Sequence, residues 1–327
     1  MAGLGAVMTL SALYDVPAPA KLNLFLHVTG RRADGYHLLQ SVFVLIDWCD
    51  TLHFERRPDG RLQRHDLGPP LPADDLSLRA ARALQQASGT PLGADLSVLK
   101  QLPWGAGLGG GSSDAATTLL ALNRLWGLHW PRARLQQIAL TLGADVPFFI
   151  GGQHAFVEGI GEQLTPLPVG CLKGQRFVVV KPEEAIATSA IFGSPDLARD
   201  TKAVIVMSLL ADEELQQKLL QGFGRNDLQR PAELSCTAVT QVAAWLQARF
   251  GNSRMSGSGS AVFARMGTEV QSGVASSRDV GNAANVANVA NAGSSEHAKN
   301  VLSSLPAGWT GRMCHSLDHH PLAGWAS

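Results

Sequence analysis

The sequence predicts a globular protein of two domains that contain both strands and helices. The chain has 327 residues, more than a single core usually holds. Hydrophobic residues make up 45% of it and the mean hydropathy is close to zero, as in ordinary soluble proteins. Segments with the two-residue period of strands alternate with segments of helical period. No apolar run approaches the roughly 20 residues that a membrane helix needs.

Alternating apolar residues predict two strands early in the chain, with a turn at 31–35 between them. Apolar residues then recur with the spacing of a helix, for which Asp74 or Asp75 is the expected N-cap. Pro131 and Gly143 suit the start and the end of a later helix. Strands are expected at 20–28, 41–48 and 94–99. Helices are expected at 74–88, from near 112 to about 126, and at 131–143.

The second half is expected to begin near residue 165 and to carry its own strands and helices. Residues 268–295 consist mainly of Ser, Asn, Ala, Gly and Val, which predicts a flexible surface insertion. A strand is expected at 176–181, helices at 188–192, 212–220, 232–250 and 296–305, and a glycine–serine turn leading into a strand at 255–264.

The N-terminal residues are small and apolar, but the first twenty contain neither Lys nor Arg. A secretory leader needs a positively charged start, so we expect residues 1–16 to be a loose extension. The domains are then expected at 17–164 and 165–327.

Charge and cysteine content restrict the possible partners. The 27 basic residues balance 27 acidic ones, which gives no electrostatic footprint for nucleic acid or an acidic membrane. We expect a small-molecule substrate and a monomer or homodimer. The four cysteines lack the spacing of a zinc site or a disulfide framework, which favours a reducing cytoplasm.

The most informative motif is the glycine-rich stretch Leu102-Pro-Trp-Gly-Ala-Gly-Leu-Gly-Gly-Gly-Ser-Ser-Asp114. Glycine adopts positive φ and lets backbone N–H groups surround an anion, and the helix that follows adds unpaired donors. The stretch therefore predicts a phosphate-binding loop, with a triphosphate as the expected ligand. A flexible linker or a helix-capping turn is the alternative, which the direct passage from a strand into a helix disfavours.

Two better-known phosphate loops do not fit this stretch. Residues 105–110 match G-x-G-x-x-G, but a dinucleotide fold needs an acidic residue roughly 20 positions on, and none lies between Asp114 and Asp145. The P-loop requires a lysine where this chain has Gly111. The loop is therefore of a third kind.

Phosphoryl transfer from a triphosphate needs a base, a cation and usually Mg²⁺. Asp145 is a candidate base, with a turn or cap aspartate as the alternative, and Lys21 is a candidate cation, with a solvated strand end as the alternative. Tyr36 and His37 could stack on a nucleobase and hydrogen-bond to its edge. The alternative is that they are two residues at the start of a half-buried strand. No histidine has zinc-site spacing, so no protein metal site is predicted, and His319-His320 is interpreted as a surface pair.

Six motifs spread over nearly the whole chain together resemble the GHMP small-molecule kinases. The glycine loop and the Ser-Gly-Ser-Gly turn are typical of the family. The Asp-Gly-Tyr-His motif beside Ala-Lys-Leu-Asn-Leu indicates the branch that acts on 4-diphosphocytidyl-2-C-methyl-D-erythritol. The motifs are Pro19–Leu24, Arg31–His37, Leu102–Ser113, Leu142–Phe149, Asn226–Leu228 and Ser256–Ser260.

This resemblance implies an α+β fold with a ribosomal protein S5 domain 2-like first domain, a ferredoxin-like second domain and an active site in the cleft between them. It implies ATP-dependent phosphorylation of the substrate's 2-hydroxyl in the non-mevalonate isoprenoid pathway, with ATP and Mg²⁺ as cofactors. The alternatives are another GHMP kinase, acting on mevalonate, homoserine or a sugar, and a nucleotide-binding module without catalysis.

The resemblance also implies roles for individual residues. Asp145 corresponds to the general base and Lys21 to its cationic partner, whose proximity would favour the charged form of both. Substrate contacts are expected from Asn23, Tyr36, His37, Thr188, Phe192, Gly257, Ser258 and Gly259. ATP contacts are expected from Lys100, which flanks the adenosine, and from Pro103, Gly105, Ala106, Gly107, Leu108, Gly109, Gly110, Gly111, Ser112 and Ser113.

The chain departs from the family at Asp114, where relatives usually have Asn. An aspartate pointing at the phosphates would repel them, so we expect Asp114 to face the start of the helix as a first-turn acid.

Overall fold

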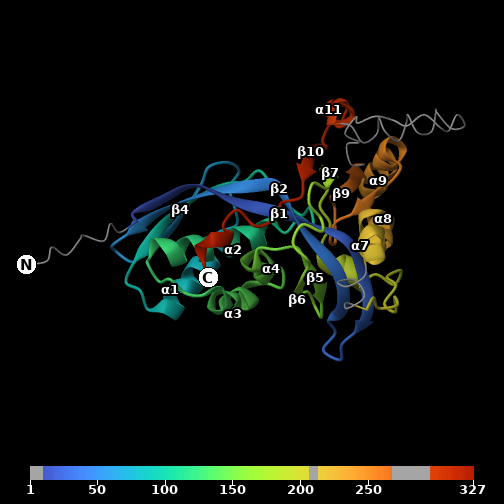
Figure 1. Cartoon of the computed structure of the whole chain (residues 1–327). Helices are drawn as coiled ribbons and strands as arrows, with labels where there is room; N and C mark the ends of the chain where they lie inside the picture. Colours follow the sequence, from blue (N-terminus) through green and yellow to red (C-terminus); the bar gives the residue numbers. More distant parts are fainter. Residues whose placement is uncertain (1–9, 206–212, 267–294) are drawn as a thin grey trace, which may run out of the picture.

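The computed structural model describes residues 10–205, 213–266 and 295–327, and within these ranges the chain forms two sheets with helices packed on each (Figure 1). Three predicted parts lie wholly or partly outside the described residues. They are residues 1–9 of the predicted extension, residue 212 at the start of a predicted helix, and all but residue 295 of the predicted insertion at 268–295. No helix in the described ranges is long and apolar enough to span a bilayer.

The first sheet has six strands and is antiparallel except for one parallel pair, β3 with β4. The strand order is β3-β4-β2-β5-β6, and β1 pairs with β2. Pairing of β1 begins with Ala12 opposite Glu55, so the loose extension expected at 1–16 is wrong from Ala12 onward. The strands are β1 (Ala12–Arg31), β2 (His37–Arg57), β3 (Leu62–Asp66), β4 (Gly93–Leu99), β5 (Ala155–Glu158) and β6 (Gln163–Pro166).

Four helices share the main core of this sheet. The side chain of Asp75 caps the first of them by accepting hydrogen bonds from the backbone N–H groups of Ser77 and Leu78, both at 3.2 Å, as its position predicted. Pro131 and Gly143 flank the third helix, again as predicted. The helices are α1 (Leu76–Ser88), α2 (Gly110–Leu125), α3 (Arg132–Leu142) and α4 (Val146–Gly151).

The second sheet has four antiparallel strands in the order β10-β7-β9-β8. The single helix expected at 232–250 is in fact two, because Cys236 takes an extended backbone conformation (φ −143°, ψ 102°) that interrupts the helical ladder. The strands are β7 (Arg176–Lys181), β8 (Arg254–Met255), β9 (Val262–Met266) and β10 (Thr310–His315), and the helices are α5 (Thr188–Gly193), α7 (Glu213–Leu220), α8 (Gln229–Ser235), α9 (Thr237–Phe250) and α11 (Ser295–Ser303).

Strand β1 connects the two halves, because its residues enter three different hydrophobic cores in turn. Ala18 packs in the core under the first sheet, Leu22 in the core between the sheets, and Val28 in the core of the second sheet. Irregularities in the β1–β2 register change the direction in which successive side chains of β1 point. The Asp227 carboxylate accepts a hydrogen bond from the Val28 N–H at 2.8 Å and so fixes this end of β1 to the second half.

The last described residues return from β10 to the first sheet, where the C-terminal segment lies beside α2 (Figure 1). The Leu317 N–H donates to the Leu45 carbonyl at 2.9 Å. The Arg132 guanidinium donates to the carbonyls of Ala323, the first residue of η1 (Ala323–Trp325), and of Ala326, which follows it. His320 is buried with only 2% of its surface exposed. The interpretation of His319-His320 as a surface pair is therefore wrong for His320.

Candidate active site

Two cavities share the glycine loop as a common wall. The larger, about 750 Å³, opens between the two halves of the chain. The smaller, about 390 Å³, lies between the loop and the region of α1. Gly105, Gly107 and Gly109 line both cavities, so the two cavities meet at the glycine loop.

The conformation of the loop depends on these three glycines. Gly105, Gly107 and Gly109 have φ values of 60°, 69° and 72°, a region that favours glycine. The Ser260 N–H donates to the Gly105 carbonyl and the Lys21 N–H to the Leu108 carbonyl, both at 2.9 Å. These bonds turn the two carbonyl oxygens toward the protein, so that they do not face an anion, which they would repel. The loop therefore suits a phosphate.

The loop also packs closely against the serine–glycine turn of the second half. The Ser256 hydroxyl donates to the Gly107 carbonyl at 3.0 Å, and a Cβ atom added to Gly107 would lie 2.1 Å from the Ser256 carbonyl oxygen. The Asn226 amide supports the turn by donating to the carbonyls of Met255 and Gly257 at 2.7 and 2.8 Å. The two glycine-rich motifs of the sequence therefore meet at this site.

Lys21 and Asp145 face one another in the larger cavity. The Lys21 ammonium lies 3.6 Å from the Asp145 carboxylate and donates a hydrogen bond of 2.5 Å to the Asn23 side-chain oxygen. Lys21 and Asn23 share one face of β1 because residues two apart on a strand point the same way. Asp145 occupies the N-cap position of α4, but its side chain does not cap the helix. Its carboxylate is therefore available to a ligand.

The electrostatics of this pair follow from its unequal burial. Lys21 is 4% exposed and the Asp145 side chain 29%. Burial lowers the pKa of Lys21, and the Asp145 carboxylate opposes that shift only in part. Phe43 adds a further interaction, because its ring centroid lies 4.5 Å from the Lys21 ammonium. A buried ammonium beside a partly exposed carboxylate suits the removal of a proton from a neighbouring hydroxyl.

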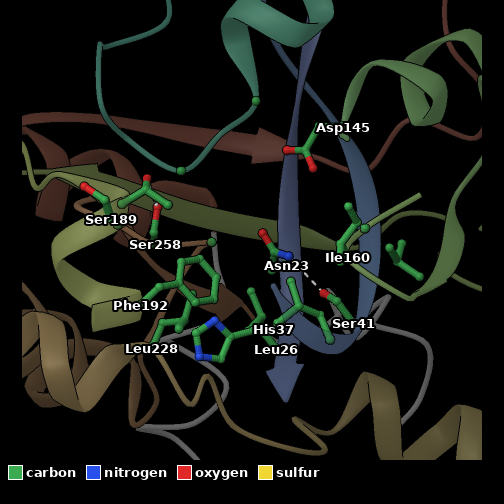
Figure 2. A pocket seen from close by; sticks show the side chains of 18 of the residues that line it. Asn23, Leu26, His37, Ser41, Asp145, Ile160, Ser189, Phe192, Leu228 and Ser258 are labelled. Carbon is green, nitrogen blue, oxygen red and sulfur yellow. Dashed lines mark hydrogen bonds between the residues drawn. The ribbon is translucent and has the colours of Figure 1, made fainter. Parts of the chain in front are cut away.

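The other end of the larger cavity is aromatic. Figure 2 shows Phe192 and His37 at one end, Asp145 at the other and Asn23 between them. The His37 and Phe192 rings stack with centroids 5.0 Å apart and planes at 28°. Tyr36 lines the same cavity and is 60% exposed, so a planar group has aromatic surface available here.

The environment of Asp114 differs from the prediction. Asp114 lies beyond the first turn of α2, which contains no acidic residue, and its side chain is buried. Its carboxylate is 2.7 Å from the Lys100 ammonium, which also contacts Asp50. The first-turn role is therefore wrong: Asp114 lies too far into α2, and its carboxylate pairs with Lys100 instead.

The structure brings most of the predicted site residues to the two cavities. Ser113 lines neither cavity and is fully buried in α2. The Thr188 and Ser258 hydroxyls lie 2.7 Å apart and join α5 to the serine–glycine turn. The larger cavity is lined by Lys21, Asn23, Tyr36, His37, Gly105, Gly107, Gly109, Asp145, Thr188, Phe192, Gly257, Ser258 and Gly259, and the smaller one by Lys100, Pro103, Gly105, Ala106, Gly107, Leu108, Gly109, Gly110, Gly111 and Ser112.

Several residues at the site were not predicted. Ser41 accepts a hydrogen bond from the Asn23 amide at 2.9 Å, and Phe43 lies opposite Asn23 in the β1–β2 register. The period-two pattern of β2 could have placed both on the face that meets Lys21 and Asn23. Arg199 contacts His37 from a loop without regular structure, and no local pattern in the sequence indicates that contact.

Comparison with known proteins identifies the family. The model of the GHMP kinases N terminal domain matches residues 75–153, and that of the GHMP kinases C terminal matches residues 206–291. A 4-diphosphocytidyl-2-C-methyl-D-erythritol kinase of Methylibium petroleiphilum is 59% identical over 98% of this chain and 100% of that protein. The chain belongs to the GHMP kinase family.

Other relatives agree with this assignment. A 4-diphosphocytidyl-2-C-methyl-D-erythritol kinase of Polaromonas sp. is 50% identical over 98% of this chain and 96% of that protein. A crystal structure of 4-(cytidine 5'-diphospho)-2C-methyl-D-erythritol kinase has a TM-score of 0.70 and 31% identity, covering 92% of this chain and 98% of that chain. A mevalonate kinase structure, at 12% identity over 92% of this chain and 98% of its own and with a TM-score of 0.62, shares the fold.

The predicted GHMP kinase family and its two-domain α+β fold are thereby confirmed. The roles of individual site residues and the domain boundary at 164/165 stay predictions.

Proposed function

We propose that this chain is a 4-diphosphocytidyl-2-C-methyl-D-erythritol kinase, which transfers the γ-phosphoryl group of ATP to the 2-hydroxyl of that substrate. The observation that carries this proposal is the position of Lys21 and Asp145, which face one another at 3.6 Å beside the glycine wall shared by both cavities. The printed names of relatives that are 50% and 59% identical over 98% of the chain support the same substrate.

The reaction follows from the two cavities. ATP would occupy the smaller cavity, with its phosphates along residues 105–112, and the substrate would occupy the larger one. Asp145 takes the hydroxyl proton while the hydroxyl oxygen forms a bond to the γ-phosphorus and the bond from that phosphorus to the bridging oxygen of ADP breaks. Lys21, held by Asn23, stabilises the negative charge that develops on the oxygen.

The aromatic end of the larger cavity supports a cytidine group in the substrate. Phe192 and Tyr36 offer rings on which a base can stack, and His37 lies beside them to hydrogen-bond the base edge. Because the His37 and Phe192 rings already stack, the base would bind against another face of this aromatic group. Thr188 and Ser258 line the same cavity, where the diphosphate of the substrate would lie.

Magnesium is part of the proposal because phosphoryl transfer usually requires it. In the described ranges, no group of three His, Cys, Asp or Glu side chains gathers in a form that could hold a metal ion. The Ser112 hydroxyl lines the smaller cavity and is the side chain of the loop best suited to an ion carried by the triphosphate. The ion would neutralise charge on the phosphate oxygens. A cytoplasmic location is also proposed, since all four cysteines are free.

The direct test is turnover by the purified full chain with ATP, Mg²⁺ and each candidate acceptor, followed by ³¹P NMR for a new phosphomonoester. We expect phosphorylation of 4-diphosphocytidyl-2-C-methyl-D-erythritol at its 2-hydroxyl. Phosphorylation of mevalonate, homoserine or galactose instead would assign the chain to another branch of the family. ATP binding without transfer to any of these acceptors would favour a binding module.

A further inference from the structure

Arg199 makes a contact at the aromatic end of the larger cavity that the catalytic scheme does not use. Its Nε–H donates to Nε2 of His37 at 3.1 Å. The rest of the guanidinium is held by backbone carbonyls: Nη1 donates to Leu197 at 3.1 Å, and Nη2 donates to Phe192 at 3.1 Å and Ser194 at 2.8 Å. The guanidinium is therefore fixed in position when it meets the imidazole.

This contact determines which nitrogen of His37 carries the proton. A guanidinium has only donors and stays protonated, so the ring nitrogen that it meets must be the acceptor. Neutral His37 then carries its proton on Nδ1. Burial and the charges of Arg199 and Arg31 lower the pKa of His37, which disfavours protonation of both nitrogens.

We infer that Arg199 is a positioning residue that holds His37 as the Nδ1–H tautomer, so that His37 presents a hydrogen-bond donor to the base of the substrate. Among the described residues, Nδ1 of His37 has no hydrogen-bond partner, which leaves its proton for a ligand in the cavity that His37 lines. The inference rests on the proposed function for the identity of that ligand.

The tautomer has a consequence for base selection. Position N3 of cytosine is an acceptor, whereas N3 of uracil carries a hydrogen. A fixed Nδ1–H donor meets a lone pair on cytosine and a second donor on uracil, and an unmatched polar group at a binding site is costly. A histidine free to change tautomer would accept from uracil as readily as it donates to cytosine. Arg199 therefore favours a cytidine substrate over the corresponding uridine compound.

The first arm of the test measures the tautomer directly in the ligand-free full chain. The ¹⁵N chemical shifts of the two His37 ring nitrogens show which one is protonated. We expect a single Nδ1–H form in the wild type and a mixture, or the Nε2–H form, in Arg199→Met. Arg31→Met is the matched control, because it removes a nearby positive charge while its own hydrogen bond goes to the Gly35 carbonyl and not to His37. That variant should keep the Nδ1–H form.

The second arm compares kcat/KM for the cytidine substrate and for its uridine analogue. In Arg199→Met the preference for cytidine should fall about tenfold, through the KM of the acceptor, with the KM of ATP unchanged. Arg199→Lys, which keeps a charged donor, should recover part of the preference. An unchanged tautomer or an unchanged preference in Arg199→Met would overturn the inference, provided that circular dichroism shows a folded protein.

The two proposals fail separately. If the wild type phosphorylates no cytidine compound but its His37 tautomer depends on Arg199, the proposed substrate is wrong and the positioning role stands. If the cytidine substrate is turned over while His37 is protonated on Nε2, the proposed function stands and the role of Arg199 is wrong.

Discussion

Two lysine–aspartate clusters lie beside the glycine loop, one in each cavity, and they have opposite properties. In the larger cavity the Lys21 ammonium is 3.6 Å from Asp145, whose side chain is 29% exposed. In the smaller one the Lys100 ammonium contacts Asp50 and Asp114, which are 0% and 4% exposed. The same two residue types therefore form an open, loosely paired cluster and a sealed, tightly paired one.

The pKa shifts of the two lysines show what this difference does. Burial works against the charge of both. At Lys21 burial prevails and lowers the pKa, because only the single Asp145 carboxylate, 3.6 Å away, opposes it. At Lys100 the two carboxylates outweigh burial and raise the pKa. Asp50 also accepts hydrogen bonds from the N–H groups of Gln101 and Leu102 at 2.6 and 2.8 Å, so the sealed cluster anchors the start of the loop. We infer that the open cluster is catalytic and the sealed one structural.

The largest expected effect is on catalysis, from Asp145→Asn. This change keeps the size of the side chain but removes the proton acceptor, so kcat should fall by about 10²–10⁴-fold while the KM of ATP stays nearly constant. The melting temperature should fall only modestly, because Asp145 makes no capping bond in α4 and is partly exposed, although Lys21 loses its counter-charge. Steady-state kinetics and calorimetry on the same preparations measure both quantities.

A control for Asp145→Asn is Asp59→Asn, which removes an exposed carboxylate paired with Arg57 away from both cavities. That variant should keep wild-type kinetics. Full turnover by Asp145→Asn would remove Asp145 from the role of base and would leave the open cluster without a catalytic function.

The second largest effect is expected on stability, from Lys100→Met. Removing the ammonium leaves Asp50 and Asp114 buried without their cation, which should cost about 3–5 kcal/mol in the free energy of unfolding. Lys21→Met is the paired variant: it should cost less stability, because Asp145 is partly exposed, and far more of kcat. Urea denaturation and turnover distinguish the two. Equal losses of stability would contradict the contrast between the clusters.

The sequence could predict one of these clusters and only half of the other. Lys21 and Asp145 lie in motifs that resemble the family, so their roles came from the resemblance together with the chemistry that phosphoryl transfer requires. Lys100 was predicted as a nucleotide contact, but its pairing with Asp50 and Asp114 depends on how β2, β4 and α2 pack. No local pattern encodes a contact between residues 50 positions apart.

The same distinction applies to the fold. Strongly periodic segments such as Gly93–Leu99 and Arg132–Leu142 agree with their predicted ranges to within a residue. Short elements such as β5 and β6 were missed because four residues are too few to show a period. The expected loose extension failed at Ala12 because residues 12–16 are ordered by pairing with β2, a tertiary contact, and are too few to show a strand period of their own.

A smaller effect is expected from the glycine loop, and it is isolated by comparing Gly107, in the loop, with Gly89, which ends α1. Gly107 and Gly89 have φ values of 69° and 67°, but an added Cβ would overlap a neighbour only at Gly107, 2.1 Å from the Ser256 carbonyl oxygen. Gly89→Ala should cost about 1–2 kcal/mol from backbone strain alone. Gly107→Ala should cost about 1–3 kcal/mol more and also reduce activity, since the two cavities share this residue. Similar losses of stability in the two variants would show that the loop can move away from the turn.

The smallest effect concerns the charge of the sealed cluster and is tested with Asp114→Asn. Burial and the neighbouring charge of Asp50 raise the pKa of Asp114, although Lys100 opposes the shift. A raised pKa in the folded state means that the folded protein binds a proton which the unfolded chain has already lost. That contribution to stability is complete below about pH 4 and is lost as the pH rises through the folded pKa. Asp114→Asn removes this titration.

The measurement is best made between pH 7 and 9, because other buried groups titrate on the acid side. Burial lowers the pKa of His154 to about 4 and of His320 to about 3, so these histidines destabilise the fold only as the pH falls below about 6.5. Above pH 7 the wild type should lose about 1 kcal/mol of unfolding free energy that Asp114→Asn retains. Parallel urea-unfolding curves for the two proteins across this range would mean that Asp114 is already ionised at pH 7. The sealed cluster would then carry a net negative charge below the phosphate loop, a charge that a neutral cluster of Asp50, Lys100 and protonated Asp114 avoids.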